Sequence, residues 1–200
     1  MPPRLHIDRA LASSRASSED RAEVFAHGDD TVIVVADGAG GVSGGGDASD
    51  LFVDAIRAAV GRSELDLVAV FGAVDRVLAS RDAGETTAIV VVVGPRGLSG
   101  VSVGDSEAWV VTSHAVDDLT ASQTRSRLGS GRAEPVAFTR ATLDGTIVVG
   151  TDGLFKYASI DAIAKAARET GDATAMIELV RLRSGALPDD VAVVLGRAES

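Results

Sequence analysis

The chain has 200 residues, of which 46% are hydrophobic, so it is long and apolar enough for a single domain over residues 1–200. Its net charge of −10 argues against binding to nucleic-acid phosphates, and its lack of cysteine excludes disulfides, zinc–thiolate sites and thiol nucleophiles. The opening "MPPRLHIDRALASSR" lacks a continuous apolar segment, so we do not expect a signal peptide, and no segment approaches the roughly 18 apolar residues of a membrane span. We therefore expect a cytoplasmic monomer that binds neither nucleic acid nor membrane.

In chain order, the first strong signal is the buried strand "VIVVADGAGG" (32–41), which ends on Asp37 and runs into a glycine-rich turn. Helical periodicity predicts helices over 47–62, 64–81, 160–171 and 173–185. Ser63 is the predicted N-cap of the second helix. Apolar, β-branched runs predict further strands over 86–94, 97–105, 107–113, 146–153 and 189–197.

The order of these elements indicates the fold class. Runs of strands, with the helices gathered in two pairs, favour an α+β layered sandwich over a βαβ repeat. The segment 113–135 is polar and weakly patterned, and we interpret it as a surface segment that could border a site.

Acidic residues recur where the predicted strands end. Asp37, Asp105 and Asp152 each follow a strand, and Asp189 and Asp190 precede the last one. Each aspartate alone is explained by an ordinary turn, but the ends of strands in shared sheets can converge at one edge. Two carboxylates about 4 Å apart repel by roughly 4 kcal/mol at an effective dielectric of 20, so such a group needs cations or protons between its members. Carboxylate oxygens suit Mg²⁺ or Mn²⁺, and the absence of cysteine disfavours zinc.

Six segments, in order from Arg15 to Leu195, resemble the motifs of the metal-dependent type 2C Ser/Thr protein phosphatases. They are "RASSED", "VVADGAGGVSGGGDAS", "GETTA", "VSVGDSEAW", "VVGTDGLF" and "PDDVAVVL". The resemblance implies an α+β fold, a four-layer α-β-β-α sandwich with two central, mostly antiparallel β-sheets. It also implies Mg²⁺- or Mn²⁺-dependent hydrolysis of phosphoserine and phosphothreonine by a metal-activated water. The implied partners are a phosphoprotein substrate and a Ser/Thr kinase or its targets.

The resemblance also implies a set of metal ligands. Asp37 would bridge two metal ions, and the carbonyl of Gly38 would be a further ligand. Asp152 and Asp189 would complete the shell of one ion. Glu19 would act on the other ion, directly or through water.

Three further residues take roles by the same resemblance. Asp105 would share a third, more labile ion with Asp152, so that two or three ions are implied. Asp20 would support the metal ligands. Arg15 would bind the substrate phosphate, because an arginine fork suits pairs of phosphate oxygens. Arg15 and Asp37 are thus the candidate catalytic residues.

The chain departs from the family pattern at several positions. Ala39 stands where eukaryotic members have a histidine proposed as general acid, which leaves the protonation of the leaving group unassigned. Ser18 and Asp190 each replace an asparagine, and Glu107 replaces a common arginine. Lys156 follows "DGLF" where an acidic residue is common.

Two other functions remain open at this point. One is a non-catalytic, phosphoprotein-binding or regulatory module of the same fold, which loss of the metal-binding aspartates would favour. The other is a phosphatase of small phosphorylated metabolites, since a shared metal centre does not select the leaving group.

Overall fold

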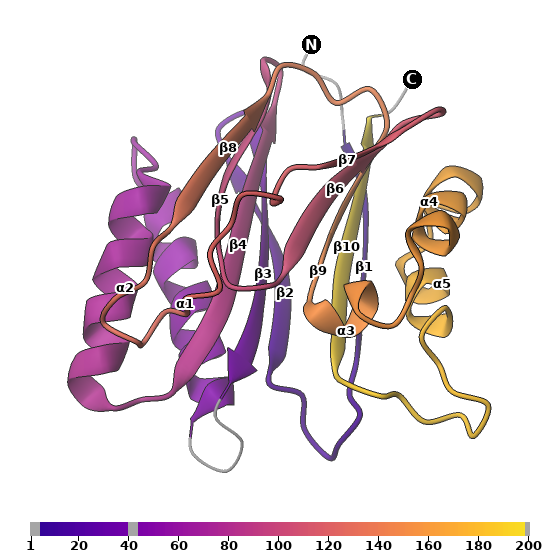
Figure 1. Cartoon of the computed structure of the whole chain (residues 1–200). Coiled ribbons are helices and arrows are strands. Elements are labelled where there is room, and N and C mark those ends of the chain that lie inside the picture. Colours follow the sequence, from indigo (N-terminus) through magenta and orange to yellow (C-terminus); the bar gives the residue numbers. More distant parts are fainter. Residues whose placement is uncertain (1–4, 40–43, 199–200) are drawn as a thin grey trace.

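The computed structural model describes residues 5–39 and 44–198. Two five-stranded sheets lie face to face, and a pair of helices covers the outer face of each sheet (Figure 1). The first sheet has the order β1-β10-β9-β6-β7 and the second the order β2-β3-β4-β5-β8. The strand pairings in the described residues are antiparallel. The predicted α+β, four-layer sandwich is therefore confirmed.

The first sheet consists of β1 (Leu5–Ala12), β6 (Glu107–Val111), β7 (Val116–Asp118), β9 (Thr146–Gly150) and β10 (Val191–Ala198). The second consists of β2 (Asp20–His27), β3 (Asp30–Ala39), β4 (Glu85–Gly94), β5 (Gly97–Val103) and β8 (Val136–Arg140). The helices are α1 (Gly45–Val60), α2 (Leu67–Arg81), α3 (Asp152–Phe155), α4 (Ile160–Glu169) and α5 (Ala173–Glu178). No helix in this described part of the chain is long and apolar enough to cross a membrane.

The continuous apolar run of β3 reflects its place between two layers. Successive side chains of a strand point to opposite faces. Val32 and Val34 therefore pack towards α1 and α2, whereas Ile33 and Val35 pack towards the first sheet. Because both faces of β3 are buried, apolar and polar residues do not alternate along it. Asp37, the first carboxylate after this apolar run, comes where the strand leaves the core.

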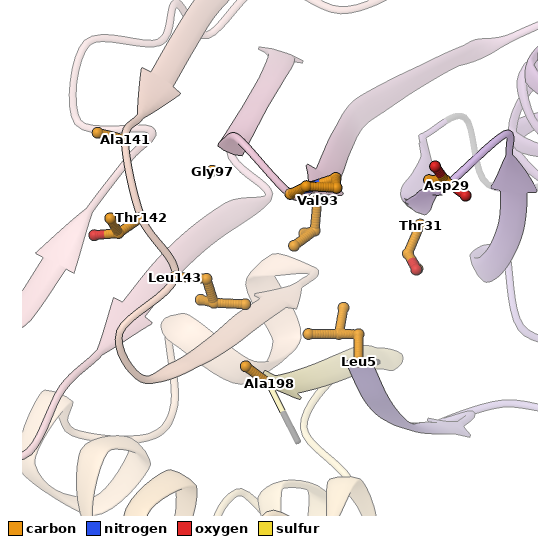
Figure 2. Close-up of a pocket in the computed structure, with 11 residues that line it drawn as sticks. Leu5, Asp29, Thr31, Val93, Gly97, Ala141, Thr142, Leu143 and Ala198 are labelled. Carbon is orange, nitrogen blue, oxygen red and sulfur yellow. The ribbon is translucent and has the colours of Figure 1, made fainter. Parts of the chain in front are cut away.

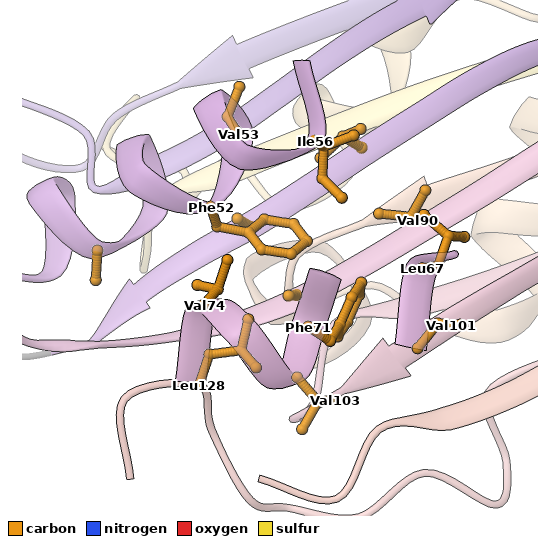
Figure 3. Close-up of a cluster of buried hydrophobic side chains, with 14 of the residues drawn as sticks. Phe52, Val53, Ile56, Leu67, Phe71, Val74, Val90, Val101, Val103 and Leu128 are labelled. Carbon is orange, nitrogen blue, oxygen red and sulfur yellow. The ribbon is translucent and has the colours of Figure 1, made fainter. Parts of the chain in front are cut away.

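The outer helices seal two further apolar layers. On one side, Phe52 of α1 and Phe71 of α2 meet edge to face, with ring centroids 5.0 Å apart (Figure 3). On the other side, Ile163 of α4 and Met176 of α5 are fully buried against the first sheet. Three stacked cores thus hold the strand ends, and the residues on them, in fixed positions.

Two predicted helix boundaries are wrong. The second helix begins after Asp66, whose carboxylate accepts a hydrogen bond from the Ala69 amide at 3.0 Å, so Asp66 and not Ser63 is its N-cap. The predicted helix 173–185 ends at Glu178. Helical apolar spacing in the sequence continues past Glu178 because Val180 is buried in the core. The backbone of Val180, however, is in a turn and not in the helix.

Strands β1, β2 and β8 were not predicted, because their residues are mostly half-buried and their alternation is weak. The segment 113–135 is also less superficial than expected. It contains β7, and its Leu128 is fully buried and pairs through its backbone with Thr86. This segment therefore packs beside the start of β4.

An apolar pocket lies where β3 begins, lined by residues that include Leu5, Thr31, Val93 and Leu143 (Figure 2). Asp37 is six residues after Thr31 on the same strand, which corresponds to about 20 Å at about 3.3 Å per residue. The pocket and the carboxylates at the strand ends are thus at opposite ends of the sandwich.

We expect the Phe71→Ala variant to lower the free energy of unfolding by about 3–5 kcal/mol, since it empties a fully buried site. The matched control is Val68→Ala on the same helix, where the side chain is 51% exposed and the expected change is within about 0.5 kcal/mol. Urea denaturation of both variants measures the difference. Equal losses would contradict the packing described for α2.

Candidate metal centre

Three carboxylates meet at one edge of the sandwich. Asp37 lies near the end of β3, Asp105 in the turn between β5 and β6, and Asp152 at the start of α3. One oxygen of each lies within 4.8 Å of the other two. A strand of one sheet, the turn between the sheets, and the short helix that follows β9 of the other sheet each contribute one of these acids.

Strand pairing brings a fourth acid beside them. Asp20, the first residue of β2, is directly opposite Asp37 in the β2–β3 ladder. The buried hydroxyl of Thr151 donates a hydrogen bond to Asp20 Oδ2 at 2.7 Å and accepts one from the Ala192 amide at 3.0 Å. Thr151 thus links β2 of one sheet to β10 of the other sheet, at a position next to the carboxylates.

The turn that carries Asp105 is held by hydroxyl contacts. The hydroxyls of Ser106 and Thr87 lie 2.7 Å apart, and Thr87 Oγ1 accepts a hydrogen bond from the Asp37 amide at 3.3 Å. On its other side, the Gln123 side chain donates to the Ser106 carbonyl at 2.9 Å. The segment 113–135 therefore contacts the turn that positions Asp105.

Burial and repulsion raise the pKa values of the innermost acids. Burial is the largest cause for Asp37, followed by the negative charges of Asp20 and Asp152, and together they raise the pKa of Asp37 to about 9. Burial also raises the pKa of Asp20 to about 7, although its hydrogen bond from Thr151 acts in the opposite direction. Without a cation, these two acids therefore tend to keep a proton.

One side-chain cation lies among these acids. The ammonium of Lys156 forms an ion pair with Asp152, one helical turn earlier, and its Nζ is 3.9 Å from Asp105 Oδ2. The hydrogen bond to Asp152 is the main cause that raises the pKa of Lys156, and the charges of Asp105 and Asp189 add to it. The side chain is 53% exposed, so the ammonium reaches the cluster from the solvent side.

Glu19 and Gly38 are neighbours through their backbones. The Gly38 amide donates to the Glu19 carbonyl at 3.3 Å, and the Ser49 hydroxyl donates to the same carbonyl at 2.6 Å. Gly38 cannot carry a side chain, because a Cβ there would lie 2.2 Å from the Gly45 carbonyl oxygen. Close packing of α1 on β3 thus fixes the backbone on both sides of the carboxylates.

Asp190 anchors the loop 13–19, between β1 and β2. Its carboxylate accepts hydrogen bonds from Ser13, Ser14 and Glu19, including both the amide and the hydroxyl of Ser14. Burial opposes the charge of Asp190, but these hydrogen bonds outweigh it and lower the pKa of this carboxyl. Arg15 is exposed on the anchored loop, and Asp189 accepts a hydrogen bond from the Asp190 amide at 3.0 Å.

No protein-family model matches this sequence, and no curated protein matches it in sequence. Solved structures do match. The catalytic domain of the serine/threonine protein phosphatase PstP, in complex with two manganese ions, has a TM-score of 0.81 at 21% identity, covering 100% of both chains. This chain has the fold of the bacterial Ser/Thr phosphatases.

Two further solved structures, one of them again of PstP, have the same fold. The serine/threonine phosphatase PstP/Ppp of Mycobacterium tuberculosis has a TM-score of 0.83 at 21% identity, covering 98% of this chain and 99% of that one. The serine/threonine phosphatase Stp1 of Staphylococcus aureus has a TM-score of 0.82 at 18% identity, covering 99% and 96%. The phosphatase fold therefore extends over nearly the whole chain, as the order of the six motifs predicted.

The donor set of this phosphatase fold suits a hard divalent cation. The three clustered donors are carboxylate oxygens, and Mg²⁺ and Mn²⁺ prefer such oxygen ligands. Burial first, and then the charges of neighbouring acids, raise the pKa values of Asp20 and Asp37, so their ionised forms are costly without a cation. A divalent cation would supply the missing charge.

The structure brings only some of the predicted site residues together. It brings Asp37, Asp105 and Asp152 together, with Asp20 beside Asp37. It places the Glu19 backbone next to Gly38 but does not include the Glu19 side chain in the cluster, and the same holds for Asp189. These two acids, like Arg15, remain predictions.

Sequence reasoning missed Thr151 and the anchoring role of Asp190. Thr151 is a polar residue at the end of a wholly buried strand, which is a usable signal, because a buried hydroxyl needs a partner. Asp190 had no such signal. Its partners lie more than 170 positions away in the sequence, at the other end of the chain.

We expect the metal-free protein to lose stability as the pH rises from about 5 to about 9. The folded pKa values of Asp20 and Asp37 lie above their ordinary value of 3.8, so the stability that they contribute is complete below that value and is lost as the pH rises through about 7 and about 9. Thermal unfolding in a chelator at several pH values measures this slope. Asp37→Asn should flatten the slope, whereas the exposed control Glu64→Gln should not. A melting temperature that rises over this range would contradict the assignment.

Proposed function

We propose that this chain is a Mg²⁺- or Mn²⁺-dependent protein phosphatase that hydrolyses phosphoserine and phosphothreonine. The observation that carries the proposal is the cluster of Asp37, Asp105 and Asp152, with oxygens within 4.8 Å, in a chain with the fold of the Ser/Thr phosphatases. PstP binds two manganese ions in the related structure. A cluster of acids has no role in packing this core, and its repulsion makes it costly to keep without a function.

The chain offers the ligands that two or three ions need. Asp37 would be a ligand of two ions and the Gly38 carbonyl a further ligand, with Asp152 and Asp189 holding one ion and Glu19 acting on the other, directly or through water. When bound, divalent cations lower the pKa of water and neutralise the charge that develops on a phosphoryl group. The buried Asp20 would hold Asp37 in place through their mutual hydrogen bond, while Thr151 fixes Asp20 itself.

Arg15 would bind the substrate phosphate. It is exposed on the loop 13–19, which Asp190 ties down immediately beside Asp189. A guanidinium can donate two parallel hydrogen bonds to two phosphate oxygens, which orients the phosphate as well as neutralising it. The anchored loop would keep this arginine at a fixed distance from the metal ligands.

The substrate that suits this arrangement is a phosphorylated residue on a protein surface. Arg15 and Lys156 are both exposed, which supports a site that is open to solvent and not an enclosed cavity. A small metabolite gains most of its affinity from a concave, largely enclosed pocket. The apolar pocket near Leu5 cannot serve this purpose, because it lies at the far end of the sandwich.

We expect hydrolysis of p-nitrophenyl phosphate and of a phosphothreonine peptide only in the presence of Mn²⁺ or Mg²⁺. Asp37→Asn should lower kcat by more than about a hundredfold, beyond the effect of losing a residue that only supports a ligand. The metal-free variant should stay folded, since the change removes a repulsive charge. Activity that survives exhaustive chelation would refute the metal mechanism, and metal binding without turnover would favour the non-catalytic module.

We expect Arg15→Ala to lower kcat/KM by about ten- to a hundredfold, at roughly 1.4 kcal/mol for each factor of ten. Arg15→Lys should recover only part of the loss, because an ammonium supplies the charge without the fork. Steady-state kinetics on the phosphothreonine peptide measures both, with Arg62→Ala, another exposed arginine, as the control. An unchanged kcat/KM in Arg15→Ala would remove Arg15 from the site.

A further inference from the structure

The position of Lys156 among the carboxylates has no counterpart in the proposed catalytic roles. Its ammonium pairs with Asp152 and lies 3.9 Å from Asp105 Oδ2, so it contacts two of the three acids in the cluster. A divalent cation bound by the same two carboxylates would require the same space. The ammonium and that cation therefore exclude each other.

The local backbone directs this lysine to the cluster. Lys156 follows α3 directly, and its amide donates to the Asp152 carbonyl at 2.8 Å, which continues the helical turn. Residues four apart lie on the same face of a helix, so the side chains of Asp152 and Lys156 are neighbours by construction. Because α3 begins at the end of β9, the backbone of the lysine is positioned together with that of the acid with which it pairs.

The residue type matters as well as the place. The chain contains only two lysines, Lys156 and Lys165, against 17 arginines, the remainder of its 19 basic residues. A lysine ammonium is a compact charge on a flexible stem, whereas an arginine fork tends to hold carboxylates in fixed pairs. With 53% of its side chain exposed, Lys156 can swing into solvent when a stronger cation arrives.

We propose that Lys156 acts as a tethered cation that occupies the Asp105–Asp152 edge of the centre and must be displaced before a metal ion binds there. The inference rests on the proposed metal centre and adds a determinant of metal occupancy. The ion assigned to Asp37 and Glu19 shares no carboxylate with the lysine, whereas an ion that uses Asp152 competes with it, so the chain would fill its metal sites in two stages. The second stage opens only at a higher metal concentration.

Calorimetric titration of Mn²⁺ into the metal-free protein tests this proposal. Lys156→Gln should tighten the weakest Mn²⁺ site by about tenfold, the factor expected when the wild-type edge is free of the ammonium for about a tenth of the time. Lys165→Gln, which removes the other, exposed lysine on α4, is the matched control and should leave the isotherm unchanged. Adding Asp105→Asn to Lys156→Gln should abolish the gain.

Thermal unfolding gives a second test, in which the same Lys156→Gln change that tightens Mn²⁺ binding should lower the stability of the metal-free protein. Without metal, Lys156→Gln should lower the melting temperature by about 2–4 °C, because the acids lose their neutralising charge. Saturating Mn²⁺ should remove this deficit, and Lys156→Arg, which keeps the charge, should not show it. A lysine with a purely structural role would give the same deficit with and without Mn²⁺, and that result would overturn the proposal.

Acetylation of the two lysines, followed by mass spectrometry, tests the displacement itself. Mn²⁺ should raise the labelling rate of Lys156 and leave that of Lys165 unchanged. If Mn²⁺ binds identically to wild type and Lys156→Gln, that result supports the metal centre and refutes the tethered-cation proposal. If none of the variants binds Mn²⁺, the proposed function fails first and this proposal fails with it.

Discussion

Repulsion between like charges at short range is the constraint on which this molecule depends. Asp37, Asp105 and Asp152 bring their oxygens within 4.8 Å, and Asp20 adds a buried fourth acid. At an effective dielectric of 20, two ionised carboxylates about 4 Å apart repel by roughly 4 kcal/mol, a cost that the protons retained by Asp20 and Asp37 reduce when no cation is bound. The three stacked apolar cores must outweigh this cost, and they leave the acids no freedom to move apart.

Neutral hydrogen bonds supply the rigidity that the charges cannot. The Thr151 hydroxyl connects the two sheets, and the Thr87 and Ser106 hydroxyls hold the turn that carries Asp105. Asp190 is the exception, since it is charged but accepts four hydrogen bonds from the loop 13–19 and is thereby fully satisfied. The fold thus separates acids that fix the structure from acids that are left available for a cation.

The sequence predicted the fold class and the clustered acids for the same physical reason. Long continuous apolar runs mark strands buried on both faces, and the carboxylate that ends such a run must lie at the edge of the core, as Asp37 does. Strands β1 and β2 lacked this signal, because one face of each is only half-buried. The anchoring of residues 13–19 by Asp190 depends on contacts between distant segments, so local patterns carry no trace of it. The contacts of Lys156 were predictable only in part. Its four-residue spacing from Asp152 can be read from the sequence, but its nearness to Asp105 cannot.

The short turn between β5 and β6 restricts where the chain tolerates insertions and deletions. Residues 104–106 carry it from one sheet to the other with Asp105 at the centre, and a Cβ on Gly104, where φ is +103°, would lie 2.6 Å from the Thr87 side chain. An inserted or deleted residue here would move Asp105 and shift the sheets against each other. The return crossing from β7 to β8, over 119–135, is long enough to absorb changes in length. Natural insertions should therefore accumulate in the second crossing and be absent from the first, so the two connections between the same sheets would evolve at very different rates.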